Sequence, residues 1–585
     1  MPTSTASFVP DSIDATQWSE LQPLFRSLLD RDVTSAGDLE RWLEDRSDLD
    51  ATCSEGAAGL YIAMTCNTDK PECADAYTKY VENVQPELTR ISFELNKKQA
   101  ELSEQFGIGD AGFRNGRYVV LTRDIKAEVD LFRDENVPIQ TELDKLGQEY
   151  QAIVGRMSVE FDGKERTIPQ MAVYYESTDR AVREQAWREV AQRRAQDVEP
   201  INTIFDKQIK LRDSFSRNAG FKDYIDYTFV AKHRFDYTPD HCKAFHDACE
   251  KHVVPFMRDL EKERKQLLGI DTLRPWDLAV DVKGRAPLKP FTDGADLVAK
   301  TRAVFDAFSP DLGAMFRELG DNGVVSSRHL ESLLDLDSRK GKGPGGYQYM
   351  QDKSGKPFIF MNAAGTQRDV HTMVHEAGHA FHSQYCRDEP LVAYRHAPIE
   401  FCEVASMSME LLTMPYWKGG DRYFTDETDY MRAKRQQIEG SVTMLPWIAT
   451  IDAFQHWIYA HPNHTQQERS AYWLTLHKRF GSSADWSGFE QLHETNWQRQ
   501  SHLFNVPMYY IEYGIAQLGA LGLWIKSLEE GERFALDAYA RAMRLGGSRP
   551  LPQLFEAAGL PFDFGPDIVG RLVDRVRAEL SKLPA

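Results

Sequence analysis

A chain of 585 residues is far longer than one small domain, so we expect at least two lobes around a large core. The composition is 42% hydrophobic, 27% charged and 11% aromatic, which is typical of a folded soluble protein and excludes extensive disorder. The 70 Lys and Arg residues against 89 Asp and Glu residues leave a net charge of −19, and this disfavours nucleic acid as a partner because phosphate would be repelled.

The first eighteen residues contain neither a basic start nor an apolar run, so we expect no secretory signal. The longest weakly polar stretch, 513–525, is too short to span a bilayer. These observations predict a cytoplasmic protein without a membrane partner, and they do not address its oligomeric state. The seven cysteines form no C-x-x-C pair, which argues against a disulfide framework and against a cysteine-bound structural zinc.

Helical periodicity dominates the first third of the chain. Residues 76–106 and 124–156 are predicted to form two long amphipathic helices, and the glycine-punctuated segment 107–116 between them is predicted to be a loop. Residues 158–168 contain short alternating runs on either side of Asp162-Gly163, which predicts a hairpin. A further helix is predicted to begin near residues 177–179.

The rest of the chain is also mostly helical, with one exception before residue 365. Two short strands are predicted at 347–350 and 358–361, joined by a polar turn. The run KGKGPGG at 340–346 lacks the spacing of a phosphate-binding loop, so we interpret it as a flexible loop beside the sheet. The expected fold class is therefore mainly α, with one small β-sheet next to the helix that follows.

That helix carries the strongest chemical signal in the sequence. Thr366 and Asp369 fit a helix cap, so the helix is predicted to begin near Gln367. His375 and His379 are four residues apart and project from one face, where two imidazoles can share a metal ion. Zinc lowers the pKa of a coordinated water towards about 7, and a carboxylate beside that water can accept its proton.

The glutamate selects this pair of histidines from a longer stripe. His371 and His382 lie on the same helix, and spacing alone also permits the pairs 371/375 and 379/382. Only His375 is followed directly by a glutamate, Glu376, within an H-E-x-x-H arrangement. We therefore predict a zinc site at His375 and His379 with Glu376 as the general base.

A third ligand is expected from the segment IEFCEVASMSMELLTMP, whose helical pattern stops before Pro415. Glu403 and Glu410 share one face of this helix with Ser406, and a glutamate on an otherwise apolar face needs a partner. From spacing alone, Glu400, Glu403 and Glu410 all remain possible ligands.

Three blocks in order make the sequence resemble the oligoendopeptidase F branch of the thimet oligopeptidase family: RDVHTMVHEAGHAFHSQY, EFCEVASMSMELL and HLFNVPMYYIEYGIAQL. The family's E-x-x-S-x-x-x-E pattern falls on Glu403, Ser406 and Glu410. The resemblance implies one zinc ion per chain, with Glu403 as the third ligand and Glu410 as a carboxylate that orients a ligand histidine.

The third block implies an oxyanion-stabilising group opposite the metal. It matches His502, Tyr509 and Tyr513, and imidazole and phenol donors suit a developing negative charge. Tyr510 lies between the two tyrosines, so the choice among the three tyrosines stays open. We expect substrate contacts at Gly345, Gly346, Tyr347 and Tyr510.

The resemblance implies a zinc-dependent endopeptidase that hydrolyses internal bonds of short unstructured peptides. It also implies two helical lobes around a deep substrate channel. We expect an amino-terminal helical domain over 1–200, which includes the hairpin, and a catalytic domain over 201–585. The alternatives are a zinc carboxypeptidase or dipeptidyl carboxypeptidase of similar architecture, and an inactive peptide-binding homologue.

Overall fold

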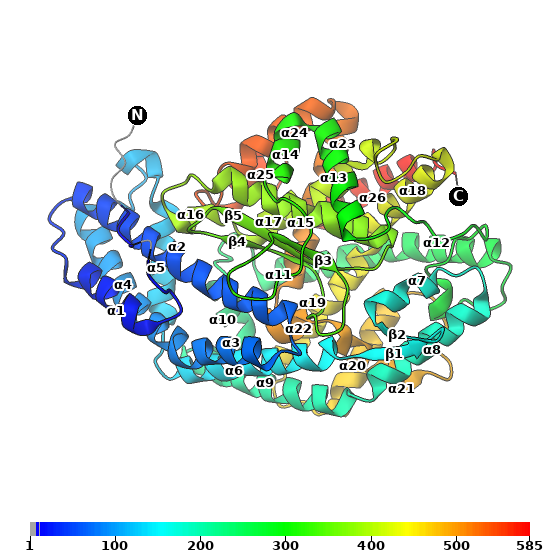
Figure 1. Cartoon of the computed structure of the whole chain (residues 1–585), viewed down its shortest axis with the longest axis horizontal. Helices are drawn as coiled ribbons and strands as arrows, with labels where there is room; N and C mark the ends of the chain where they lie inside the picture. The colour runs from blue at the N-terminus through cyan, green and yellow to red at the C-terminus, as the bar shows by residue number, and fades with distance from the viewer. Residues whose placement is uncertain (1–6, 11, 585) are drawn as a thin grey trace.

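The computed structural model describes residues 7–10 and 12–584 and confirms a mainly helical fold. The amino-terminal helices, blue in Figure 1, are α1 (Trp18–Asp30), α2 (Ala36–Cys66), α3 (Pro71–Asn83), α4 (Gln85–Phe106) and α5 (Val119–Leu131). The helices that follow, up to the small sheet, are α6 (Asn136–Gly155), α7 (Ala172–Tyr175), α8 (Arg180–Ala195), α9 (Val198–Asn218), α10 (Tyr224–Ala231), α11 (Pro239–Ala248), α12 (Val254–Leu267), α13 (Gly294–Phe308) and α14 (Pro310–Arg317).

Twelve further helices follow the sheet in the described part of the chain. They are α15 (Gln367–Cys386), α16 (Val392–Arg395), α17 (Ile399–Leu412), α18 (Glu427–Thr443), α19 (Leu445–Ala460), α20 (Gln466–Phe480), α21 (Glu490–Glu494), α22 (His502–Asn505), α23 (Tyr510–Glu529), α24 (Glu532–Met543), α25 (Leu551–Ala557) and α26 (Pro566–Leu580). Across the described residues, no helix has both the length and the apolar character that a membrane span requires.

Each of the two long helices predicted near the amino terminus is divided in the structure. The first is replaced by α3 and α4, which meet at Val84, and the second by α5 and α6, which are separated by residues 132–135. Pro86 and Pro138 lie in the first turns of α4 and α6. Proline has no N–H to donate to the preceding turn, so it is tolerated at the start of a helix but not within one.

The predicted hairpin is present as β1 (Ser158–Phe161) and β2 (Lys164–Thr167), which pair antiparallel. Asp162 and Gly163 form the two-residue turn with φ angles of 53° and 69°. These left-handed conformations are the ones that Asp-Gly adopts in tight hairpins.

The second sheet lies beside α15, as expected, but it has three strands rather than two. β4 (Tyr347–Gln351) pairs antiparallel with β5 (Lys356–Ala363), and β3 (Leu334–Asp337) pairs parallel with the other edge of β5. The sheet order is therefore β3-β5-β4, which leaves β4 at an edge.

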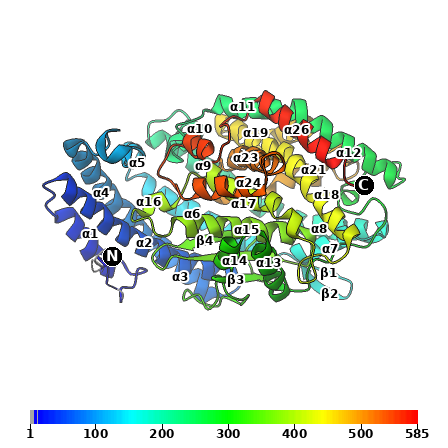
Figure 2. The same cartoon turned by 90° about the horizontal axis from the view of Figure 1, so that it is seen from above.

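The two faces of β5 are covered by different helices. Phe358 and Phe360 pack in a cluster with residues of α2, whereas Ile359 and Met361 belong to the large core that includes α15. Such alternation is expected for a strand buried on both sides. Figures 1 and 2 show the sheet in the middle of the molecule, beside α15 in both views.

The described residues form one large hydrophobic core, one smaller amino-terminal core and two minor clusters, one at α2 and β5 and one at the β1–β2 hairpin. The large core extends from α6 to α26, and the smaller core is built mainly from α1, α2, α4 and α5. Figure 2 shows these amino-terminal helices together at one end of the long axis. The expected domain boundary near residue 200 stays a prediction.

Two helices of the large core, α15 and α17, approach very closely at Gly378. A Cβ atom added at Gly378 would lie 2.6 Å from Ser406 Cα and 2.7 Å from the Ala405 carbonyl oxygen. These separations are shorter than van der Waals contact, so any side chain at this position would force the two backbones apart.

Candidate metal centre and its surrounding cavity

Helix α15 presents two histidines side by side. Its first turn is capped by the Asp369 carboxylate, which accepts hydrogen bonds from the Thr366 N–H at 2.8 Å and the Ala364 N–H at 2.9 Å. The helix begins at Gln367, as the sequence predicts. His375 and His379 lie one turn apart with ring centroids 4.9 Å from each other and planes at 85°.

Helix α17 brings a carboxylate to both histidines. Glu403 Oε2 lies 3.2 Å from His375 Nε2 and 3.4 Å from His379 Nε2. The Ser406 hydroxyl donates to the same oxygen at 2.9 Å, and the Tyr509 hydroxyl donates to Glu403 Oε1 at 2.6 Å. Glu403 is therefore the glutamate of α17 whose carboxylate meets both imidazoles.

The other two candidate glutamates have different surroundings. Glu400 accepts a hydrogen bond from the Tyr237 hydroxyl at 2.5 Å and lies 3.7 Å from the Arg234 guanidinium. Glu410 Oε1 lies 2.8 Å from Nδ1 of His375, and its other oxygen accepts a hydrogen bond from the Gln437 amide at 2.9 Å. Glu410 thus contacts the side of the imidazole that faces away from Glu403, where a carboxylate fixes the ring and its tautomer.

The charges at this centre support a negative carboxylate. Burial raises the pKa of Glu403, but the neighbouring His379 charge and the hydrogen bonds from both histidines outweigh it and hold the pKa well below its usual value. Burial lowers the pKa of His375, but its hydrogen bonds to Glu403 and Glu410 raise that pKa well above the usual value. The same residues that would hold a cation therefore stabilise positive charge.

The donor set fits a zinc ion. One ligand atom from each of His375, His379 and Glu403 lies within 4.8 Å of the others. Two imidazoles and one carboxylate, with a fourth position open, form a set that zinc uses in hydrolytic sites.

Glu376 lies next to these donors with a free oxygen. Its side chain is buried, and Oε2 accepts no hydrogen bond from the described residues. Burial raises the pKa of Glu376, which makes the carboxylate a better proton acceptor. Oε1 lies 3.4 Å from the position that a Cβ at Gly346 would occupy, so the segment leading into β4 comes close to helix α15 at this carboxylate.

His502, Tyr509 and Tyr513 form a second polar group beside the metal centre. His502 Nε2 lies 3.1 Å from the Tyr513 hydroxyl, and the two tyrosine rings are 5.0 Å apart. The Gln500 amide nitrogen lies 2.8 Å from His502 Nδ1. Because that amide donates to Nδ1, Nε2 carries the imidazole proton. Burial lowers the pKa of His502 to about 4, so the ring is neutral at pH 7.

A cavity of about 440 Å³ joins the metal centre to this polar group. It is lined on one side by α15 and α17 and on the other by β4. Its lining includes Glu376, Glu403, His502, Tyr509, Tyr513, Gly346 and Tyr347. A neighbouring cavity of about 610 Å³ shares Gly346, Tyr347 and His502 and adds Gly345.

Among the sequence-predicted site residues, Tyr510 and Glu410 line neither of these two cavities, and Tyr510 is the one expected to contact substrate. Its ring is buried against His502, with ring centroids 5.2 Å apart, and against Tyr513 at 5.4 Å. Tyr510 is the first residue of α23, and its ring packs against these two side chains instead of lining a cavity.

Comparison with known proteins identifies the family. The family model described as Peptidase family M3 matches residues 173–564. The chain belongs to this family. The matched segment contains every residue of the M3 metal centre described above and leaves out the first 172 residues, which include α1–α6 and the β1–β2 hairpin.

Relatives of the M3 chain are similar over part of their length. An oligoendopeptidase F homolog of Borreliella burgdorferi is 24% identical over 370 residues, which cover 60% of this chain and 59% of the relative. Oligopeptidase PepF of Bacillus subtilis is 24% identical over 407 residues, which cover 68% of this chain and 57% of the relative. The chain thus matches less than two thirds of either protein.

A solved structure agrees over nearly the whole fold. The structure of PZ peptidase A with an inhibitor superposes with a TM-score of 0.89 at 26% sequence identity. The superposition covers 98% of this chain and 99% of that one. The mainly helical fold of the M3 chain is therefore shared with a peptidase along its full length.

Several contributors to the M3 site escape sequence reasoning. Gln437 lies on α18 outside any recognised motif, yet its amide donates a hydrogen bond to Glu410. The Lys232 ammonium lies 5.2 Å from the centroid of the Tyr509 ring. Gln348 and Tyr349 also line the cavity, and these two residues belong to the strand 347–350 that the sequence does predict.

Proposed function

We propose that this protein is a zinc-dependent endopeptidase that hydrolyses internal bonds of short unstructured peptides. The observation that carries the proposal is the convergence of His375, His379 and Glu403 beside the unpaired carboxylate oxygen of Glu376, at the wall of a cavity. Membership of Peptidase family M3 supports the same reaction class. A peptide substrate, a cytoplasmic location and a single catalytic zinc ion are parts of this proposal.

His375, His379 and Glu403 would hold the ion, and Glu410 would orient His375. When bound, zinc would act as a Lewis acid and lower the pKa of a coordinated water towards about 7. Glu376 accepts the proton of the attacking water on its free oxygen and then delivers that proton to the leaving amine. Its raised pKa favours both transfers because the carboxyl group must gain and lose a proton near neutral pH.

The oxyanion side is formed by Tyr513 and His502. Both side chains line the cavity, and both can donate a hydrogen bond. The Tyr513 hydroxyl and His502 Nε2 lie 3.1 Å apart. Tyr509 has a different contact, because its hydroxyl is hydrogen-bonded to Glu403. We therefore propose that Tyr513 and His502 stabilise the developing negative charge and that Tyr509 positions Glu403.

Tyr513→Phe is expected to lower kcat by about 10²- to 10³-fold with little change in KM, because one donor to the transition-state charge is lost. The zinc content should stay the same. Tyr510→Phe is the matched control, since this neighbouring hydroxyl lies outside both cavities. Steady-state kinetics on a blocked peptide measure both variants, and equal losses in the two would contradict the assignment.

The edge strand β4 offers a binding surface for an extended peptide. It has a partner on one side only, and its residues from Tyr347 to Met350 line the cavity together with Gly346. A peptide that adds to a sheet edge gains main-chain hydrogen bonds whatever its side chains are. We propose that this mode, together with a deep channel between two helical lobes, admits short peptides and excludes folded proteins.

A mixed library of peptides with blocked ends tests the proposed reaction. Mass spectrometry should find cleavage at interior bonds, which a carboxypeptidase or a dipeptidyl carboxypeptidase cannot produce from blocked substrates. A chelator should abolish the cleavage, and added zinc should restore it. Binding of the peptides without any cleavage would instead indicate a catalytically inactive peptide-binding protein.

A further inference from the structure

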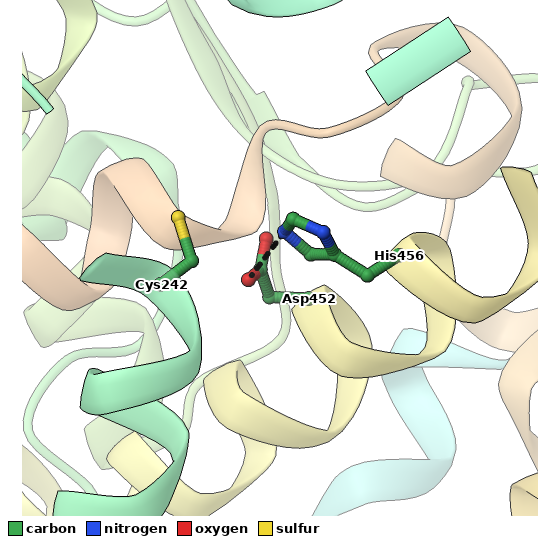
Figure 3. A group of neighbouring side chains, drawn as sticks. All are labelled: Cys242, Asp452 and His456. Carbon is green, nitrogen blue, oxygen red and sulfur yellow. Dashed lines mark ion pairs between the residues drawn. The ribbon is translucent and has the colours of Figure 1, made fainter. Parts of the chain in front are cut away.

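A second group of metal-ligating side chains lies in the core, away from the catalytic cavity. It consists of Cys242 on α11 and of Asp452 and His456 on α19 (Figure 3). One ligand atom from each lies within 4.8 Å of the others. Cys242 and Asp452 are fully buried, and the side chain of His456 is 11% exposed. None of the three lines the cavity at Glu376.

The helical spacing adds a fourth donor. Cys242 and His246 are four residues apart on α11, and Asp452 and His456 are four residues apart on α19. Residues four apart lie on one face of a helix, so each helix directs two donors towards the other. His246 Nε2 lies 2.8 Å from Asp452 Oδ2, and Figure 3 shows the Asp452 carboxylate between Cys242 and His456.

Two atoms of this group lack a hydrogen-bond partner in the described part of the chain. They are Asp452 Oδ1 and His456 Nε2, and the latter lies 3.4 Å from Asp452 Oδ2 without forming a hydrogen bond. Buried polar atoms in proteins are nearly always paired. A carboxylate and an unprotonated imidazole nitrogen are both electron-pair donors, so a cation bound by the Asp452 carboxylate and His456 Nε2 would supply the missing partner.

We propose that Cys242, Asp452 and His456 bind a structural zinc ion, and that His246, which hydrogen-bonds Asp452, completes the site as the fourth ligand. One thiolate, two imidazoles and one carboxylate supply four ligands, and a site closed by protein ligands has a structural role. With zinc–ligand bonds of about 2.0 to 2.3 Å, ligand atoms of a tetrahedral site lie roughly 3.4 Å apart. The separation of His456 Nε2 from Asp452 Oδ2 is 3.4 Å. Binding releases the Cys242 thiol proton to solvent, while the imidazole proton of His246 moves to Nδ1 as Nε2 leaves Asp452 and binds the ion.

This zinc site would also support the oxyanion side of the catalytic cavity. Gln455, one residue before His456 on α19, accepts a hydrogen bond from the Met508 N–H at 2.6 Å. Met508 directly precedes Tyr509 and has a left-handed φ of 59°. An ion that fixes α19 against α11 therefore fixes the helix that holds this strained turn.

The sequence contains no C-x-x-C pair, which is why it predicts no cysteine-bound zinc. One cysteine is sufficient for the proposed zinc site because the other three donors are histidine and aspartate side chains on two packed helices. The i, i+4 pattern of C-x-x-x-H and D-x-x-x-H is visible in the sequence, but nothing in the sequence indicates that 242–246 and 452–456 meet.

The test uses the full-length protein with Glu403→Gln, which weakens the catalytic site, after loading with zinc chloride and desalting. After desalting, elemental analysis should still find one zinc ion per chain, and added zinc should raise the melting temperature. The additional substitution Cys242→Ser should abolish both the retained zinc and the increase in melting temperature. Cys249→Ser is the matched control, because this cysteine is also fully buried nearby but its thiol contacts the Leu445 carbonyl.

Cobalt substitution in the wild-type chain gives a second reading that needs no core mutation. The catalytic ligands include no sulfur, so a thiolate-to-cobalt charge-transfer band in the near ultraviolet reports Cys242 alone. We expect that band in the wild type and in Cys249→Ser, and its loss in Cys242→Ser. Absence of the band in a cobalt-loaded wild-type chain would overturn the proposal, whether or not the protein hydrolyses peptides.

Discussion

Glu376→Gln should leave the fold and the zinc content unchanged and remove nearly all turnover. The amide cannot accept the proton of the attacking water, and loss of a general base lowers kcat by about 10²- to 10⁴-fold. The side chain keeps its size, so it still fits into the space beside Gly346, where an added Cβ atom would lie 3.4 Å from Oε1. Single-turnover and steady-state cleavage of a blocked peptide, with zinc analysis of the same sample, measure the effect.

Glu427→Gln is a suitable control for Glu376→Gln, because Glu427 is exposed in the first turn of α18 and lines neither of the two cavities. It should cleave peptides at the wild-type rate. If Glu376→Gln also cleaves at that rate with its zinc retained, Glu376 is not the base, and another acceptor must be found among the residues that line the cavity.

Glu403→Gln should remove the catalytic zinc ion. The change takes away the one anionic ligand and leaves two imidazoles, and it also deprives the Ser406 and Tyr509 hydroxyls of a charged acceptor. We expect affinity for the catalytic ion to fall by more than the 10- to 100-fold that loss of an outer hydrogen-bond partner costs. Competition with a chromogenic chelator measures the affinity.

The zinc affinity of Glu410→Gln distinguishes a residue that orients a ligand from a residue that is itself a ligand. Glu410 contacts His375 on the nitrogen that faces away from Glu403, so its replacement should weaken zinc binding by roughly 10- to 100-fold and not more. Equal losses of affinity in Glu403→Gln and Glu410→Gln would contradict the assignment of Glu403 as the ligand.

The local part of the site could be predicted from the sequence because a helix fixes the spacing of its own residues. His375, Glu376 and His379 follow from one turn of α15, and the cap at Asp369 marks where that helix begins. Glu403 could not be chosen over Glu400 and Glu410 from spacing, because the choice depends on how α17 lies against α15. The family resemblance pointed to Glu403, and the geometry places the same carboxylate between the two imidazoles.

The errors in the fold prediction have local physical causes. Pro86 and Pro138 divide helices whose amphipathic pattern continues across the break, so periodicity alone joins them. Strand β3 reads Leu-Asp-Leu-Asp, and its buried Asp335 obscures the apolar signal of a buried strand. Asp335 is tolerated there because Arg339 and Lys342 pair with it, and that pairing also anchors the glycine-rich run that the sequence suggests is a free loop.

The close approach at Gly378 has a consequence for how the protein handles its catalytic ion. Backbone contact between α15 and α17, made possible by a missing Cβ, already fixes the distance between the histidines and Glu403. In small zinc-dependent domains the ion must organise its own ligands, and its removal unfolds the chain. Here the backbone packing of α15 against α17 would hold the ligand residues together without help from the ion, so a chelator should yield a folded apoprotein that exchanges metal without refolding.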